Sequence, residues 1–107
     1  MVDSFTNALM SDTVSVEFSQ KLTQIQRKLY SYILSLVPNR AEAEDILQES
    51  NVVLCRKATE FDKDRNFQAW AFRIARYQVM AFFKKRKRSK LVFSEGIVDL
   101  LAEELED

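Results

Sequence analysis

The sequence has no histidine and only one glycine, one proline and one cysteine among its 107 residues. Without histidine there is neither a Ser-His-Asp nor a Cys-His nucleophile system, and no His-ligated metal site. Gly96 alone cannot form a glycine-rich phosphate loop, and Cys55 alone permits neither an internal disulfide nor a four-cysteine zinc site. These absences disfavour an enzyme. We interpret Cys55 as a small packed hydrophobe of a protein from a reducing compartment.

The scarcity of glycine and proline also bears on the fold. Sheets rich in hairpins need turn residues about every ten residues, and this chain has almost none. We therefore expect an all-α fold, a compact bundle of three main helices with weaker N- and C-terminal helical segments. The opening residues lack the features of a signal peptide, and no apolar run approaches the roughly 18 residues of a membrane span. We expect a cytoplasmic protein with no membrane span.

The first predicted helix follows Ser11, Asp12 and Thr13, any of which can cap a helix, and ends before the turn at Pro38 and Asn39. Apolar residues recur along it at steps of three and four, which is the spacing of an amphipathic helix. These positions are Phe18, Leu22, Ile25, Leu29, Ile33 and Leu36.

Two further helices are predicted over 41–60 and 67–88, with the polar stretch 62–66 as a loop between them. A weaker amphipathic segment covers 94–107. The apolar face of the helix over 41–60 comprises Ile46, Leu47, Val53, Leu54, Ala58 and Phe61. The apolar face of the helix over 67–88 comprises Phe67, Trp70, Ala71, Ile74, Ala75, Val79 and Phe82.

Charge is balanced in sum but segregated along the chain. Sixteen basic and sixteen acidic residues give a formal net charge of zero. Six cations nevertheless fall within residues 84–90, which we call the basic run, and six anions without a cation follow over 95–107, the acidic tail. A partner can bind the two regions separately. We expect the acidic tail to shield the basic run partly when no nucleic acid is bound; the alternative is a freely solvated linker.

The second predicted helix carries an acidic face. Asp45, Gln48 and Glu49 lie at i, i+3 and i+4, so they share one side of the helix. One interpretation is a solvated helix N-terminus, where acidic residues also suit the helix dipole. The other is a docking surface for a basic partner helix. Paired carboxylates for acid-base catalysis are disfavoured because nothing resembling a pocket accompanies them.

The third predicted helix carries cations with an aromatic residue among them, opposite its apolar face. The stripe consists of Arg73, Arg76, Tyr77, Met80, Lys84 and Lys87. Cations neutralise phosphates and flat side chains stack on unpaired bases, so this mixture suits single-stranded or melted nucleic acid. The alternative is a solubilising face with Tyr77 at the edge of the core. Trp70 is expected in the core rather than against a base.

Two motifs together resemble region 2 of bacterial RNA polymerase sigma factors, and most closely the extracytoplasmic-function (ECF) group of the sigma-70 family. The first is Ala43-Glu44-Asp45 followed by Gln48-Glu49. The second is Phe67 and Trp70 leading into Ile74-Ala75-Arg76. The resemblance covers roughly residues 18 to 90, and the joint spacing of the two motifs is specific.

The resemblance implies a role in transcription initiation and no catalysis, cofactor or metal. On the polymerase side, the positions that match the surface docking on the clamp helices of the β′ subunit are Asp45, Gln48, Glu49 and Asn51. On the promoter side, the loop over 62–66, with Lys63, Arg65 and Asn66, matches the loop that captures a base flipped out of the −10 element. Arg73, Arg76 and Tyr77 match the helix that meets the melted non-template strand, and Lys84 and Lys87 belong to a run that holds the backbone. An anti-sigma factor is a further implied partner.

Two features differ from the family pattern. Tyr77 stands where the family usually has asparagine, so the base preferred there need not be the family's. The chain also ends shortly after region 2, so we expect a fragment without the C-terminal domain that reads the −35 element. We divide it into a leader over 1–14, region 2 over 15–90 and the start of a linker over 91–107.

The rival hypotheses are a helical protein-interaction module or regulatory adaptor without a DNA role, and a small carboxylate-only hydrolase.

Overall fold

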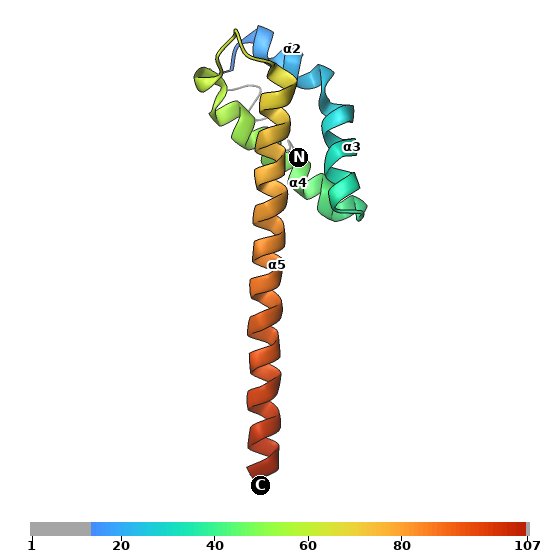
Figure 1. The fold of residues 1–107 in the computed structure, drawn as a ribbon, viewed down its shortest axis with the longest axis vertical. Coiled ribbons are helices and arrows are strands. Elements are labelled where there is room, and N and C mark those ends of the chain that lie inside the picture. Colours follow the sequence, from blue (N-terminus) through green and yellow to red (C-terminus); the bar gives the residue numbers. More distant parts are fainter. Residues whose placement is uncertain (1–13, 107) are drawn as a thin grey trace, which may run out of the picture.

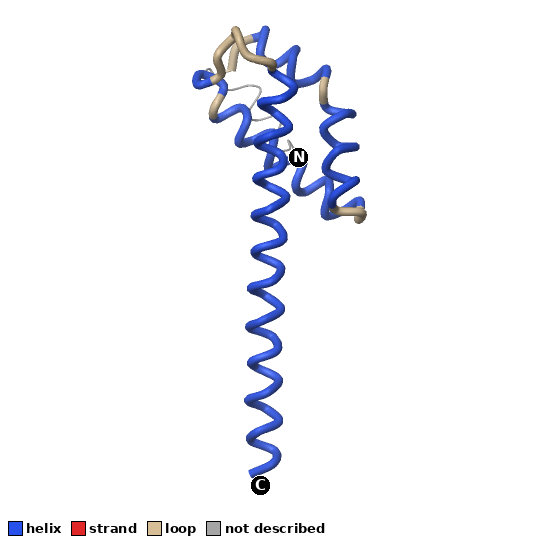
Figure 2. Tube along the Cα trace, viewed as in Figure 1, coloured by secondary structure: helices blue, strands red, loops and turns tan. Residues whose placement is uncertain are grey.

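The structure is a computed structural model that describes residues 14–106. Its elements are α2 (Val16–Gln24), α3 (Gln26–Leu36), α4 (Arg40–Arg56), the short 3₁₀ helix η1 (Ala58–Glu60) and α5 (Phe67–Glu106). Within these residues there is no strand, which confirms the expected all-α class (Figure 2). No helix in this part of the chain has both the length and the apolar character needed to cross a membrane. The caps expected at Ser11, Asp12 and Thr13, and nearly all of the leader, lie outside the described residues.

The first predicted helix is in fact two helices that meet at Ile25. Ser15 caps α2, its side-chain oxygen accepting a hydrogen bond from the Phe18 backbone N–H at 3.1 Å. At Ile25 the backbone N–H bonds to the Leu22 carbonyl, three residues back, at 3.3 Å, which tightens the turn and ends α2. The prediction of a single helix was wrong because the apolar spacing continues through the break, and Ile25 itself is buried.

The turn predicted at Pro38 and Asn39 is confirmed. The Asn39 side chain accepts a hydrogen bond from the Glu42 backbone N–H at 3.0 Å and so caps α4. At its other end α4 stops at Arg56 rather than near residue 60, and η1 follows. The tighter η1 turns the chain so that Phe61 packs on Trp70, with ring centroids 4.8 Å apart.

Helix α5 is one element of 40 residues, where two separate helices were predicted over 67–88 and 94–107. The prediction of a break between 88 and 94 was wrong because residues 89–93 contain neither glycine nor proline, so nothing in the backbone interrupts the helix there. Figure 1 shows α5 running the length of the molecule, with α2, α3 and α4 gathered around its first half. The acidic tail therefore lies beyond the basic run on one straight axis. The expectation that it folds back to shield that run is wrong for this structure.

The core lies between the first half of α5 and the three other helices, inside a molecule 67 Å long and 27 by 24 Å across. Most of the predicted apolar faces are buried in it. The buried apolar residues are Phe18, Leu22, Ile25, Leu29, Ile33, Val37, Ala43, Ile46, Leu54, Cys55, Ala71, Ile74, Ala75 and Val79. Leu36, predicted in this set, is instead 40% exposed, because Val37 takes the inward position at the end of α3.

Candidate functional site

The acidic face of α4 forms one wall of a groove. Asp45 and Glu49 are exposed, and Gln48 is half-buried. The opposite wall comes from α5, and the groove holds a cavity of about 220 Å³. Its lining residues are Asp45, Ile46, Glu49, Gln78, Ala81, Phe82 and Lys85. The α5 residues were not predicted to belong here, because sequence spacing does not show which faces of two helices meet.

A single ion pair joins the start of α4 to the basic run. Arg86 lies 3.7 Å from the Glu42 carboxylate, and both side chains are partly exposed. Such pairs contribute little to stability, on the order of 0–1 kcal/mol. The pair does partly compensate one cation of the basic run, whose side chains are all exposed.

Asn51 does not lie on the acidic face. Its side chain is fully buried, and its amide exchanges two hydrogen bonds with Gln26 of α3, at 2.9 and 2.8 Å. The neighbouring Ser50 is also buried and donates to the Ile46 carbonyl at 2.7 Å. A partner cannot reach the Asn51 side chain in this conformation, so the expected docking role conflicts with its position.

The loop between η1 and α5 is held by its own polar side chains. The Asp62 side chain accepts a hydrogen bond from the Asp64 backbone N–H at 3.0 Å. The Asp62 backbone carbonyl accepts one from the Arg65 backbone N–H at 2.9 Å. The Asn66 side chain accepts from the Ala69 backbone N–H at 2.9 Å and so caps α5. Asn66 therefore has a structural role that its motif position did not reveal.

Two cavities open beside this loop, and they share Arg65 and Trp70. One, of about 240 Å³, is lined by Arg65, Asn66, Ala69, Trp70 and Arg73. The other, of about 280 Å³, is lined by Glu60, Phe61, Asp62, Arg65 and Trp70. The first cavity brings together three residues predicted to bind DNA from two different elements. Trp70 is half-buried against the core, as predicted, but it also forms a wall of both cavities.

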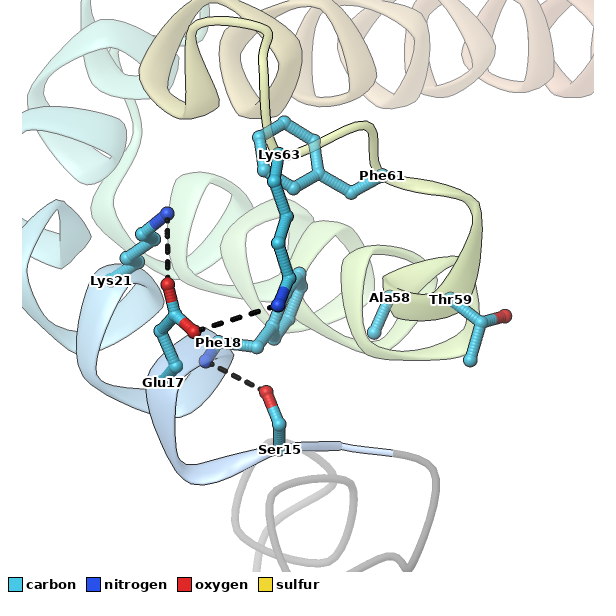
Figure 3. Close-up of a pocket in the computed structure, with 8 residues that line it drawn as sticks. All are labelled: Ser15, Glu17, Phe18, Lys21, Ala58, Thr59, Phe61 and Lys63. Carbon is cyan, nitrogen blue, oxygen red and sulfur yellow. Dashed lines mark hydrogen bonds and ion pairs between the residues drawn. The ribbon is translucent and has the colours of Figure 1, made fainter.

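Lys63 lines neither of these two cavities. Its ammonium group is 3.8 Å from the Glu17 carboxylate, which also lies 3.6 Å from Lys21 (Figure 3). The three side chains surround a separate cavity of about 250 Å³. Phe18 and Phe61 form its apolar wall, and the Lys21 ammonium lies 5.8 Å from the centre of the Phe61 ring.

The stripe predicted on the third helix lies on the outer face of α5. All the cations in it are exposed, and so are Tyr77 and Met80, to 60% and 56%. The opposite face of the same helix supplies the buried residues Ala71, Ile74 and Ala75. Arg73 belongs both to this stripe and to the 240 Å³ cavity. The outer face and the loop cavity thus form one continuous surface.

Cys55 behaves as the sequence predicts for a packed residue. It is 2% exposed, and burial raises the pKa of its thiol above the ordinary value, because desolvation disfavours the thiolate. The nucleophilic form is therefore scarce at neutral pH. The described residues contain no group of three or more cysteine, aspartate and glutamate side chains arranged to hold a metal ion.

The comparison with known families identifies the class of protein. The model of the Sigma-70 region 2 family matches residues 22–89, so the chain belongs to this family. Among curated proteins it is similar to the ECF RNA polymerase sigma factor SigF of Caulobacter vibrioides (strain NA1000 / CB15N), with 32% identity over 66 residues. The aligned part is 62% of this chain and only 37% of that protein. No solved structure matches the chain significantly.

Proposed function

We propose that this chain is the part of an ECF-type sigma factor that binds the RNA polymerase core and stabilises the melted −10 element of a promoter. The observation that carries the DNA half of the proposal is the continuity of the loop cavity with the exposed cationic stripe of α5, through Arg73. Membership of the sigma-70 region 2 family supports both halves.

On the DNA side, the exposed cations of α5 pair with phosphates while Tyr77 offers a flat surface for an unpaired base. A base extruded from the non-template strand enters the cavity beside Arg65, Asn66 and Trp70. Extrusion costs a few kcal/mol, so stacking and hydrogen bonds in the cavity must offset that amount. The residues proposed to contact DNA are Lys63, Arg65, Asn66, Arg73, Arg76, Tyr77, Lys84 and Lys87. No catalytic step is needed.

On the polymerase side, the groove between α4 and α5 receives a basic helix of the β′ clamp. Asp45 and Glu49 supply the charge, and Phe82 supplies an apolar surface between the helices. Gln48 lies on the same side of α4 and is half-buried, so only its exposed part can contribute to this surface; its Oε1 atom is buried. Asn51 is left out of this surface because it is buried.

The bounds of the domain, its cellular location and a further partner are part of the same proposal. The family match ends at residue 89, which supports region 2 over 15–90 and the beginning of a linker over 91–107. Because its proposed partner is the polymerase core, we place the protein in the cytoplasm. An anti-sigma factor is a further proposed partner.

The test measures affinity for core polymerase and for a fluorescent single-stranded −10 oligonucleotide side by side. Glu49→Lys reverses a charge in the groove, whereas Glu44→Lys makes the same change at an exposed position of α4 outside it. Reversal at an interface pair commonly costs on the order of 2–5 kcal/mol, so Glu49→Lys should weaken polymerase binding at least about 30-fold. Glu44→Lys should have little effect, and neither change should alter affinity for the oligonucleotide.

Each half of the proposal can fail separately. If folded Glu49→Lys binds polymerase like the unaltered protein, or if Glu44→Lys causes the same loss, the groove is not the docking site. If the unaltered protein binds the −10 oligonucleotide no better than an unrelated single strand of equal length, the −10 role is wrong.

A further inference from the structure

The second half of α5 projects away from the rest of the molecule (Figure 1). We call residues 84–106 the α5 extension; at 1.5 Å per residue it is roughly 34 Å long. The contact between Arg86 and Glu42 lies near its start. The core includes none of the extension residues whose side chains the structure describes (84–92, 95–100 and 102), so packing against α2, α3 and α4 does not stabilise these.

The extension also exposes large apolar side chains at helical spacing. Leu91 and Val98, seven residues apart, are 56% and 62% exposed, and Ile97 beside them is 41% exposed. The sequence continues the spacing of three and four with Leu101 and Leu105. A seven-residue apolar repeat of this kind is the pattern by which two helices pack along each other. Most of the stability of a helix in a protein comes from packing of its apolar face, which the extension lacks in a single chain, and Gly96 in its middle weakens it further.

The distribution of charge along the α5 extension indicates which partner packs against the extension. The basic run begins the extension, and the acidic tail, from Glu95 onward, ends it. A straight helix keeps the two apart: Lys87 and Asp99 are about 18 Å from each other along the axis. The cations and anions therefore cannot neutralise each other within one chain. A second copy in the opposite direction places each basic run beside the partner's acidic tail, whereas a parallel copy places like charges together.

We infer that the α5 extension is a self-association surface, on which two copies of the chain pack antiparallel with their helices crossing near Gly96. The repeat of Leu91 and Val98 forms the apolar seam, and the opposed charges set the direction. Within the described part of the chain nothing lies within 4 Å of a Cβ placed at Gly96, so these residues leave the crossing point open to a partner helix. The inference does not depend on polymerase docking. It also means that self-association covers Lys84 and Lys87 and competes with DNA.

The first test is sedimentation velocity of the full 107-residue chain over a concentration series at low and high salt. We expect a monomer–dimer equilibrium that weakens as salt screens the opposed charges. Arg88→Glu with Lys90→Glu, and separately Asp99→Lys with Glu103→Lys, should each weaken dimerisation at least tenfold. An equimolar mixture of the two double variants should dimerise again, because the opposed charges are then complementary in the heterodimer.

A matched control separates this result from an effect of net charge. Arg27→Glu with Lys28→Glu makes the same change of charge at exposed positions of α3, and it should leave dimerisation as in the unaltered chain. A chain that stays monomeric at every concentration, a mixture that does not dimerise, or an equal loss in the α3 control would overturn the inference.

The direction of packing is tested by disulfide cross-linking, with Cys55 left in place because it is buried. In the antiparallel pair, residue 89 of one copy lies near residue 102 of the other. A mixture of Ser89→Cys and Ala102→Cys chains should therefore cross-link to each other. Efficient cross-linking of Ser89→Cys chains alone indicates a parallel pair, and this outcome would also overturn the inference.

Discussion

Asn51 of α4 and Gln26 of α3 hold each other through two hydrogen bonds, in which each side-chain amide donates to the oxygen of the other. Asn51 is fully buried, so this pair fixes the register between the two helices from inside the fold. A polar pair in a core is favourable only when both partners are satisfied, which is the case here.

Replacing Asn51 with Ala should lower the free energy of unfolding by about 2 kcal/mol, because the Gln26 amide loses its buried partner. Urea denaturation measures this change. Gln26→Ala and the double variant complete a mutant cycle, in which the coupling between the two residues should exceed about 0.5 kcal/mol. Additive effects would show that the pair makes no joint contribution. Polymerase affinity of the folded Asn51→Ala protein should not change.

Asn66 combines a helix cap with a position in the proposed base cavity, and two substitutions separate these roles. Asn66→Ala removes the cap and should cost about 1 kcal/mol of stability, whereas Asn66→Ser retains a capping oxygen and should cost little. If the amide reads a base, both variants should relax the preference at the same promoter position. Binding to a set of −10 oligonucleotides that differ at one base measures this. A preference that Asn66→Ser leaves intact would assign Asn66 to capping alone.

Lys63 should contact a phosphate rather than a base. Lys63→Ala is therefore expected to weaken binding to all −10 oligonucleotides by the same factor. It should also reduce the slope of affinity against salt concentration by about one counterion. Because Glu17 competes for the same ammonium group, Glu17→Gln should strengthen binding. Glu17→Gln in the Lys63→Ala background is the control, and the gain should be smaller there. A gain of the same size in both backgrounds would mean that Glu17 repels DNA directly and does not act through Lys63.

Gly96→Ala should stabilise the α5 extension by roughly 0.5–1 kcal/mol, since alanine favours helix over glycine and the added Cβ meets no neighbour within 4 Å. Hydrogen exchange of the backbone amides around residue 96 measures the gain. Amides in α4 serve as an internal control and should not change. Equal protection at residue 96 in both proteins would indicate that the extension is not helical there in solution.

Much of the fold could be predicted from the sequence, because apolar spacing reports directly which face of a helix is buried. Phe18, Leu22, Leu29 and Ile33 are all in the core as expected. The break at Ile25 could not be predicted, since the chain bends there without interrupting the spacing and without glycine or proline. The continuity of α5 was missed for the opposite reason: the basic run interrupts the apolar spacing, yet the helix continues through it.

The candidate site was harder to predict than the fold. Asn51 follows the docking motif closely in sequence, yet it points into the core, because helical position and not proximity in sequence decides burial. Phe82 and Lys85 line the groove proposed for docking through packing between α4 and α5, which no local pattern reveals. Arg65, Asn66 and Arg73, predicted to bind DNA from the loop and from the helix, line one cavity because the loop leads directly into the helix that carries Arg73; their contact with DNA stays a prediction.

Because α5 is unbroken, the spacing between residues on its outer face is fixed. From Arg73 to Lys87 the helix advances fourteen residues, or about 21 Å, and no hinge allows this length to change. A nucleic-acid strand with its phosphates spaced along a duplex advances about 3.4 Å per base, so the same length corresponds to roughly six bases. A strand that makes both proposed contacts, at Arg73 and at Lys87, therefore spans a fixed interval of this length.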